Sequence, residues 1–137
     1  MTFALDTNII SYLLRPSQNK EIVERFMAET RKNNYVILPM CYYETLWYLL
    51  RKDAMAQLSV FNEIYKNSAV KINMNEAVFN KAAKIRVDLE KAGTPIGSND
   101  ADIFIAAYCI VNDYTLVTNN TKHFEHIDGL KLENWKQ

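Results

Sequence analysis

The segment Phe3-Ala4-Leu5-Asp6-Thr7-Asn8-Ile9-Ile10 carries the pattern that decides the fold. Its apolar run Phe3-Ala4-Leu5 is typical of a short buried strand. Asp6, Thr7 and Asn8 can each cap a helix, and the helical pattern of residues 9–14 begins directly after them. A buried strand that passes at once into a helix predicts an α/β fold, with Asp6 at the end of its first strand.

The alternation of strands and helices continues along the chain. Buried strands are predicted at 35–38 and 114–118, weaker strands at 70–72 and 131–133, a turn at 97–99, and helices at 21–31, 39–52, 54–65, 76–91 and 100–111. Pro39 suits the first turn of a helix, and Gly93 followed closely by Pro95 is a helix stop signal. This alternation predicts a mainly parallel sheet with helices on both faces.

The composition narrows the class of protein. The 137 residues fit one domain, and 16 basic residues balance 16 acidic ones. A formal net charge of zero argues against a strongly basic, non-specific nucleic-acid binder. It does not argue against a nucleic-acid enzyme, because a bound metal adds positive charge that the count omits. Without a signal-peptide pattern or an apolar stretch of about 20 residues, we expect a cytoplasmic protein with no membrane contact. Cys41 and Cys109 are expected to be buried, reduced thiols.

Four acidic residues lie in or beside apolar stretches, where acids are least expected. They are Asp6, Glu44, Asp100 and Asp102. Burying an ionised carboxylate is costly unless a cation or hydrogen bonds compensate it. Several such acids in one chain indicate a shared cation, and a hard divalent metal is the ion that prefers oxygen ligands.

Each acid also has a structural explanation. Asp6 can cap the first helix, a role worth about 1 kcal/mol. If Asn99 caps the helix that follows it, Asp100 and Asp102 lie in its first turn, where the helix dipole favours negative charge. Glu44 is harder to explain structurally, because its helix face carries Met40, Trp47 and Tyr48 but no basic partner. A functional role is favoured for Glu44.

Polar residues at strand ends provide a place where these acids can meet. Sites in open parallel sheets form beyond the carboxyl ends of the strands, where Asp6 and Thr118-Asn119-Asn120 are predicted to lie. Asn119 and Asn120 either form a turn or hold a water molecule on the metal. His123 and His126 are interpreted as surface or packing residues, because a third soft metal ligand is missing.

Taken together, the motifs resemble the PIN-domain ribonucleases, particularly toxins of the virulence-associated protein C type. The matching segments, in the family's order, are 5–8, Glu44, 93–97, 102–107, 116–124 and 129–135. The resemblance spans nearly the whole chain. It implies a PIN-like three-layer α/β/α sandwich with a central mainly parallel sheet, formed by residues 1–137 as one domain.

The resemblance also implies an endoribonuclease that depends on magnesium or manganese. By position, Asp6, Glu44 and Asp102 are its metal-binding catalytic acids, with Asp100 as an auxiliary acid. Asn120 takes the remaining catalytic position, where many members of the family have aspartate, so a second tightly bound metal is not implied. The implied partners are a cognate antitoxin protein, a second copy of the chain in a homodimer, and an RNA substrate such as transfer RNA.

The mechanistic hypothesis is hydrolysis of an RNA phosphodiester bond by water that a metal activates. Hydrogen bonds around the metal-binding acids would come from Thr7, Asn8, Thr118, Asn119 and Asn120. Two alternatives remain open: a nuclease of the same fold that acts on DNA or in RNA processing, and a non-catalytic interaction module. The aromatic residues of segment 42–48 are expected to lie mostly in the core, although some can stack on bases or contact an antitoxin.

Overall fold

Four short parallel strands form the centre of the molecule. The computed structural model describes residues 1–93 and 100–136. The strands are β1 (Thr2–Leu5), β2 (Asn34–Ile37), β3 (Thr115–Val117) and β4 (Lys131–Glu133), in the sheet order β2-β1-β3-β4. The register pairs Leu5 with both Ile37 and Val117, so β1, β2 and β3 end side by side. Residues that follow these three strands therefore emerge at one edge of the sheet.

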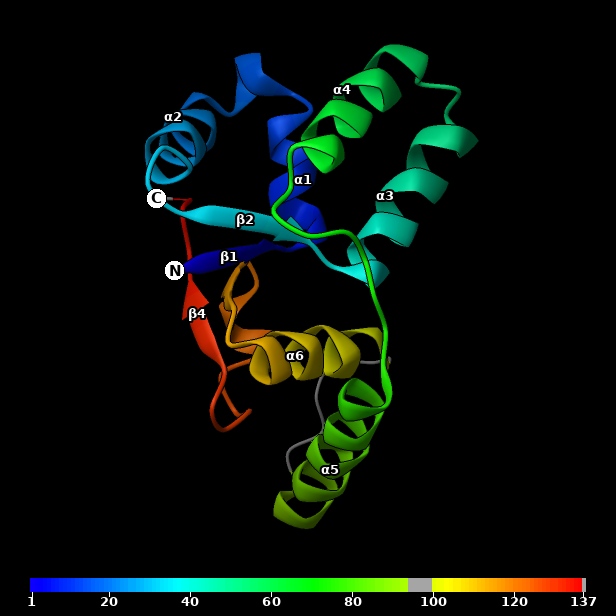
Figure 1. Cartoon of the computed structure of the whole chain (residues 1–137), viewed down its shortest axis with the longest axis vertical. Helices are drawn as coiled ribbons and strands as arrows, with labels where there is room; N and C mark the ends of the chain where they lie inside the picture. The colour runs from blue at the N-terminus through cyan, green and yellow to red at the C-terminus, as the bar shows by residue number, and fades with distance from the viewer. Residues whose placement is uncertain (94–99, 137) are drawn as a thin grey trace.

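Helices cover both faces of this sheet. They are α1 (Thr7–Leu13), α2 (Lys20–Glu29), α3 (Pro39–Arg51), α4 (Met55–Lys66), α5 (Glu76–Ala92) and α6 (Asp100–Asn112), with short 3-10 turns at Pro16–Gln18 and Thr121–His123. In Figure 1, α1 to α4 lie on one side of the strands, and α5 and α6 lie on the other. The predicted three-layer α/β/α arrangement with a parallel sheet is confirmed.

Local sequence signals explain the ends of several helices. Pro39 is the first residue of α3, where its missing N–H has no helical partner to lose. Asn75 caps α5 through its side chain, which accepts a hydrogen bond from Val78 N at 3.2 Å. Gly93 ends α5 in the left-handed conformation, with a φ of 69°. Residues 97–99, including the proposed cap Asn99, lie outside the described part of the chain.

The segment 70–72 differs from its prediction because it forms no strand. Val70 and Ile72 are both exposed, so the apolar alternation there does not reflect a buried face. Lys71 instead donates to the carbonyl oxygens of Tyr65 and Lys66 at 2.8 and 3.0 Å. The segment thus satisfies carbonyl groups that the end of α4 leaves without helical partners.

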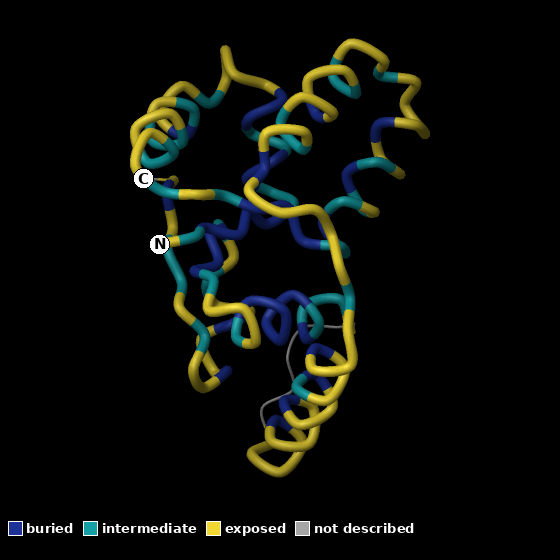
Figure 2. The backbone as a smooth tube through the Cα atoms, viewed as in Figure 1, coloured by how far each residue is buried: buried dark blue, intermediate teal, exposed yellow. Residues whose placement is uncertain are grey.

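The core lies between the sheet and the inner helices. Figure 2 shows that α6 is mainly buried whereas α5 is largely exposed. Trp135 is 1% exposed and packs edge-on against Phe3, with the ring centroids 5.3 Å apart. Cys41 and Cys109 are buried and free, as predicted. Within the described residues, no helix is long and apolar enough to cross a membrane.

Candidate active site

Asp6 lies at the junction between β1 and α1 and caps α1. Its backbone N–H donates to Val117 O at 3.0 Å, which continues the pairing of β1 with β3 by one residue. Its carboxylate accepts hydrogen bonds from Thr7 N at 2.8 Å and from Thr118 Oγ1 at 2.7 Å. The side chain is also contacted by Asn8 Nδ2 at 3.4 Å and Cys41 Sγ at 3.7 Å. Asp6 is only 7% exposed, so these neutral donors hold a buried carboxylate in one orientation.

A hydrogen-bonded loop after β3 closes one side of the site. Asn8 Nδ2 also contacts Thr118 Oγ1 at 3.4 Å, and Asn8 Oδ1 accepts from Asn119 N at 3.1 Å. The Asn120 N–H donates to Thr118 Oγ1 at 3.0 Å. The Asn119 side chain turns away to donate to Tyr12 OH at 3.2 Å. The loop is thus tied to α1, as its predicted place at the carboxyl edge of the sheet requires.

Glu44 comes from α3 and is held by α1. Thr7 Oγ1 donates to Glu44 Oε1 at 2.9 Å. Burial raises the pKa of the Glu44 carboxyl, and so do the negative charges of Asp6 and Asp102, while the hydrogen bond from Thr7 opposes these effects. The negative charges of Asp6 and Asp102 therefore lie near enough to Glu44 to affect its ionisation.

Asp102 lies in the first turn of α6, directly across from His123. Burial is the main effect that raises the pKa of the Asp102 carboxyl, and the negative charge of Asp6 raises this pKa further. His123 Nδ1 lies 3.5 Å from Asp102 Oδ2 and lowers the pKa, which offsets part of this rise. The Asp102 side chain is 21% exposed, so it is partly open to solvent, unlike Asp6.

The charge of this cluster is not balanced by basic side chains. Among the described residues, neither Asp6 nor Glu44 forms an ion pair with lysine, arginine or histidine, and Asp102 has only His123. Within the same residues, no three histidine, cysteine or acidic side chains are grouped closely enough to form a ready-made metal site. The charge of Asp6 raises the pKa values of Glu44 and Asp102, but the three carboxylates do not form a closed set of ligands in the described part of the chain. An all-oxygen set of this kind fits a hard divalent ion such as Mg²⁺.

Two of the predicted residues make no side-chain contact with Asp6, Glu44 or Asp102 in the described part of the chain. Asp100 is 61% exposed at its side chain and pairs with Arg86, whose Nη1 lies 2.6 Å from Asp100 Oδ1. Asn120 is exposed and its side chain does not cap the 3-10 turn that follows it. Their roles as auxiliary acid and catalytic residue stay predictions.

Three other residues reach the site without having been predicted there. His123 was interpreted as a surface or packing residue, but it contacts Asp102. Cys41 was expected only in the core, yet its Sγ points at Asp6 Oδ1. Tyr12 supports Asn119 through its hydroxyl. The position of Cys41 three residues before Glu44 on one helix is the signal that relates it to the site; no comparable local signal marks His123 or Tyr12.

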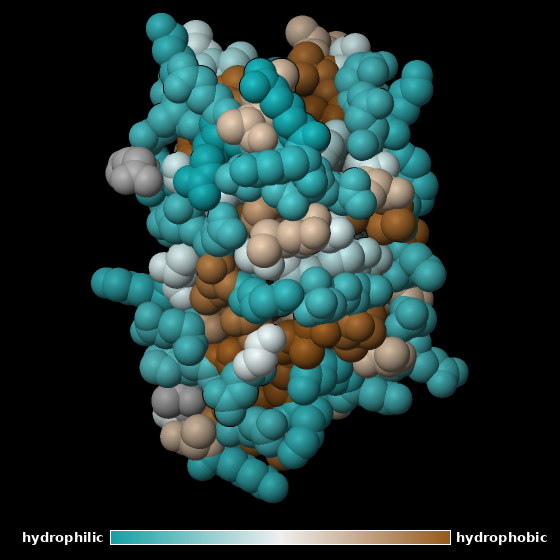
Figure 3. Space-filling model, turned by 60° about the vertical axis from the view of Figure 1, so that its left-hand side comes forward, coloured by the Kyte–Doolittle hydropathy of each residue, from teal (hydrophilic) through white to brown (hydrophobic). Residues whose placement is uncertain are grey.

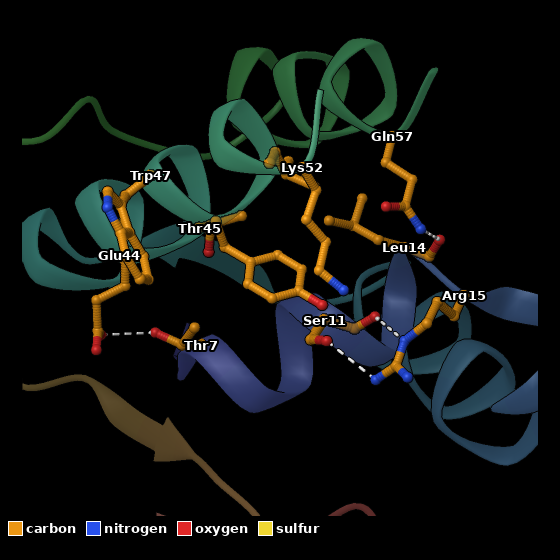
Figure 4. A pocket seen from close by; sticks show the side chains of 11 residues that line it. Thr7, Ser11, Leu14, Arg15, Glu44, Thr45, Trp47, Lys52 and Gln57 are labelled. Atoms are coloured by element: carbon orange, nitrogen blue, oxygen red, sulfur yellow. Dashed lines mark hydrogen bonds between the residues drawn. The ribbon is translucent and has the colours of Figure 1, made fainter. Parts of the chain in front are cut away.

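A pocket opens beside Glu44, between α1 and α3. Its volume is about 560 Å³ and its lining includes Thr7, Glu44, Trp47, Lys52 and Arg15. Figure 4 shows Thr7 and Glu44 at one end of the pocket and Arg15 at the other, with Lys52 reaching from the end of α3 toward α1. The acidic cluster therefore continues into a cavity with basic groups at its far end.

The fold and the site define an open-sheet α/β protein with a carboxylate cluster at the carboxyl ends of its strands. The model of the PIN domain family matches residues 3–130, and the chain belongs to this family. It resembles ribonuclease VapC2 of Rickettsia felis, with 29% identity over 136 residues and 98% coverage of both chains. It also resembles the tRNA(fMet)-specific endonuclease VapC of Shigella flexneri, with 28% identity over 137 residues and 98% coverage of both.

Solved structures show the same relationship. VapBC2 of Rickettsia felis bound to a promoter DNA fragment superposes with a TM-score of 0.84 at 25% identity, over 99% of this chain and 100% of the other. VapBC-1 of nontypeable Haemophilus influenzae gives a TM-score of 0.77 at 27% identity, over 100% of both chains. The resemblance to PIN-domain, VapC-like proteins that the motifs predicted is confirmed, and so is the PIN-like fold.

Proposed function

We propose that the chain is a divalent-metal-dependent endoribonuclease that hydrolyses RNA phosphodiester bonds. The observation that carries this proposal is that the charge of Asp6 raises the pKa values of both Glu44 and Asp102 and that, among the described residues, only His123 beside Asp102 forms an ion pair with any of these acids. The names of the similar proteins, a ribonuclease and a tRNA endonuclease, support the choice of RNA as the substrate.

Asp6 and Asp102 would hold Mg²⁺ or Mn²⁺ directly, and Glu44 would contact the ion through water. When bound, such an ion offsets charge on the scissile phosphate and makes water a stronger nucleophile at neutral pH. Asp6 needs little rearrangement to act as a ligand, because four neighbouring groups already contact its carboxylate. His123 restrains the orientation of Asp102 from the other side of the cluster.

Glu44 is suited to accept a proton from the attacking water. A carboxyl group with a raised pKa binds a proton more readily near neutral pH than an ordinary one. Thr7 fixes Oε1 by donating to it, so the proton would go to the other carboxylate oxygen. Asn120 would act as a neutral, exposed group at the edge of the site, contacting the substrate or a water molecule.

The same proposal includes the partners of the chain. We propose that this chain is a cytoplasmic toxin bound by a cognate antitoxin, as the resemblance to toxins of the virulence-associated protein C type implies; its likeness to the chains of VapBC structures supports this. We also propose a homodimer. Phe79 and Val87 on α5 and Val111 on α6 are exposed apolar residues. Figure 3 shows that hydrophobic residues reach the surface on one face of the molecule, mainly in its lower half.

Cleavage of total cellular RNA by the purified chain, freed of any bound partner, tests the activity. Reactions contain Mg²⁺, Mn²⁺ or a chelator, and Asp6→Asn is run beside the wild type. Discrete fragments that need the metal and Asp6 support the proposal. Equal cleavage by a clean Asp6→Asn preparation contradicts the site, and cleavage of DNA but not RNA contradicts the substrate. A folded, partner-free protein that cleaves neither favours a non-catalytic module.

A further inference from the structure

The side chains that line the pocket between α1 and α3 change from acidic at one end to basic toward the other. Glu44 and Thr7 occupy one end, Arg15 and Gln57 occupy the other, and Lys52 lies between them, as Figure 4 shows. Arg15 is held toward Ser11, with Nη2 donating to Ser11 Oγ at 3.1 Å. Among the described residues that line the pocket, Glu44 is the only acidic one, and it belongs to the cluster described above. The remaining charge of the pocket is positive, which favours an anionic occupant.

Aromatic side chains form part of the pocket wall, with Trp47 next to Glu44 in Figure 4. Trp47 is 51% exposed and Tyr48 is 41% exposed, although the segment was expected to lie mostly in the core. Cations lie against both rings: Arg51 Cζ is 4.3 Å from the centroid of Trp47, and Lys52 Nζ is 4.8 Å from that of Tyr48. Accessible aromatic rings backed by basic groups are the elements that proteins use to stack the bases of single-stranded nucleic acids.

One buried hydroxyl in this wall lacks a partner. Thr45 is 5% exposed and lines the pocket, and its Oγ1 has no hydrogen-bond partner in the described part of the chain. Figure 4 shows this oxygen on the side of α3 that faces α1. A buried hydroxyl that loses water without gaining a hydrogen-bond partner destabilises the folded protein. Because Thr45 lines the cavity, its hydroxyl is placed to bond a molecule that enters it.

We propose that this pocket is a nucleotide subsite that receives one unpaired nucleotide of the RNA substrate, next to the phosphate that is cleaved. The inference rests on the proposed function, because the cleaved phosphate is placed at the acidic cluster. The base lies against Trp47 and Tyr48, and its phosphate faces Arg15 and Lys52. A volume of about 560 Å³ lies within the roughly 300–1,000 Å³ of pockets that enclose small organic ligands.

The subsite has a consequence for the class of RNA. A base can enter the pocket and stack on a side chain only when it has left its own helix, so the cleavage point must be single-stranded. An RNA that carries the cleaved sequence in a loop or an open strand should bind and be cut. The same sequence annealed to its complement should be protected.

Binding of a labelled single-stranded RNA in excess chelator, followed by fluorescence anisotropy, separates this subsite from catalysis. Trp47→Ala should weaken binding about tenfold or more, the size expected for loss of one base stack. Its matched control is Tyr43→Ala, a 65% exposed aromatic residue on the same helix that does not line the pocket. Lys52→Gln should flatten the salt dependence of binding by about one phosphate contact, whereas Lys66→Gln, an exposed residue on α4, should not.

Two further measurements, the melting temperature and the tryptophan emission, test the subsite without relying only on weakened binding. Thr45→Val should raise the melting temperature, because an unpaired hydroxyl is replaced by a methyl group, and yet weaken RNA binding about two- to tenfold. Of the two tryptophans, Trp135 is 1% exposed, so quenching of tryptophan emission by RNA should come from Trp47 and vanish in Trp47→Phe.

The outcomes distinguish the subsite from the activity. If RNA is cleaved in a manner that depends on Asp6, but Trp47→Ala and Lys52→Gln behave like their controls, the subsite is overturned and the proposed function stands. If Trp47→Ala weakens binding of an antitoxin and leaves RNA binding unchanged, the pocket belongs to a protein partner and the subsite is again overturned. If the chain neither binds nor cleaves RNA, both proposals fail.

Discussion

Thr118 Oγ1 donates a hydrogen bond to Asp6 Oδ2 at 2.7 Å, and this contact joins the ends of two adjacent parallel strands. Thr118 is fully buried, and its hydroxyl oxygen in turn accepts a hydrogen bond from Asn120 N at 3.0 Å. The hydroxyl therefore has two tasks, to orient the carboxylate and to shape the loop that follows β3. The contribution of the Thr118 hydroxyl to activity and stability can be measured separately from that of the Asp6 carboxylate.

Replacing Thr118 by valine should lower RNA cleavage about 10- to 100-fold, the usual effect of removing a group that orients a metal ligand. Valine keeps the shape of threonine but cannot donate to Asp6, so the buried carboxylate loses its shortest hydrogen bond. We expect a loss of about 1–3 kcal/mol in the free energy of unfolding, measured by denaturant titration. Thr118→Ser keeps the hydroxyl and should retain most of the activity; equal losses in both variants would assign Thr118 a packing role instead.

Metal binding should depend on Asp6 and not on Asp100. Addition of Mg²⁺ should raise the melting temperature of the wild type, since a ligand present at 100 times its Kd stabilises the folded state by about 2.7 kcal/mol. Asp6→Asn should remove this response. Asp100→Asn is the matched control, because Asp100 pairs with Arg86 at the surface and makes no side-chain contact with the cluster in the described part of the chain. If Mg²⁺ did not raise the melting temperature of Asp100→Asn, Asp100 would have to be assigned to the metal site.

The parallel register explains why so much of the site could be predicted from the sequence. Asp6 directly follows Leu5, which pairs with Ile37 and Val117, so residues after the three strands meet whatever the details of packing. The strand and helix patterns predicted this edge. Thr118 and the helix that carries Glu44 therefore lie close to Asp6, as expected.

Other features depended on packing that local patterns do not encode. His123 reaches Asp102 because a 3-10 turn returns the chain toward α6, and Asp100 pairs with Arg86 because α5 packs on α6. Almost every residue of segment 40–50 is apolar or aromatic, so its pattern does not show which side faces inward. The structure buries Cys41, Thr45 and Leu49 and leaves Trp47 exposed.

Neutralising Glu44 should stabilise the metal-free protein at neutral pH. The folded state raises the Glu44 pKa, so it binds the proton more readily than the unfolded chain. Stability from this group is therefore greatest below the unfolded pKa of about 4.3 and is lost as the pH rises through the interval up to the raised value. In chelator, the melting temperatures of Glu44→Gln and the wild type should be similar near the lower end of this interval and separate above it, with the variant higher.

The control for this effect is Asp88→Asn, which removes an exposed acid paired with Lys84 on α5. It should show no gain in melting temperature at neutral pH. A lower melting temperature for Glu44→Gln at neutral pH would mean that the hydrogen bond from Thr7 outweighs burial and repulsion. Such a result would make Glu44 a structural residue.

The two histidines should behave differently, although they lie only three positions apart. His123 contacts Asp102 and lowers its pKa against the effects of burial and Asp6, whereas His126 contacts the exposed Glu125 at 3.7 Å. Without His123, the Asp102 pKa should rise, so a higher pH is needed to ionise a carboxylate that must bind the metal. In His123→Ala, the acidic limb of kcat/KM against pH should therefore move to higher pH, with about a tenfold loss at neutral pH. His126→Ala should keep the wild-type profile. A uniform loss in His123→Ala without movement of the limb would show that His123 acts by shape and not through the charge of Asp102.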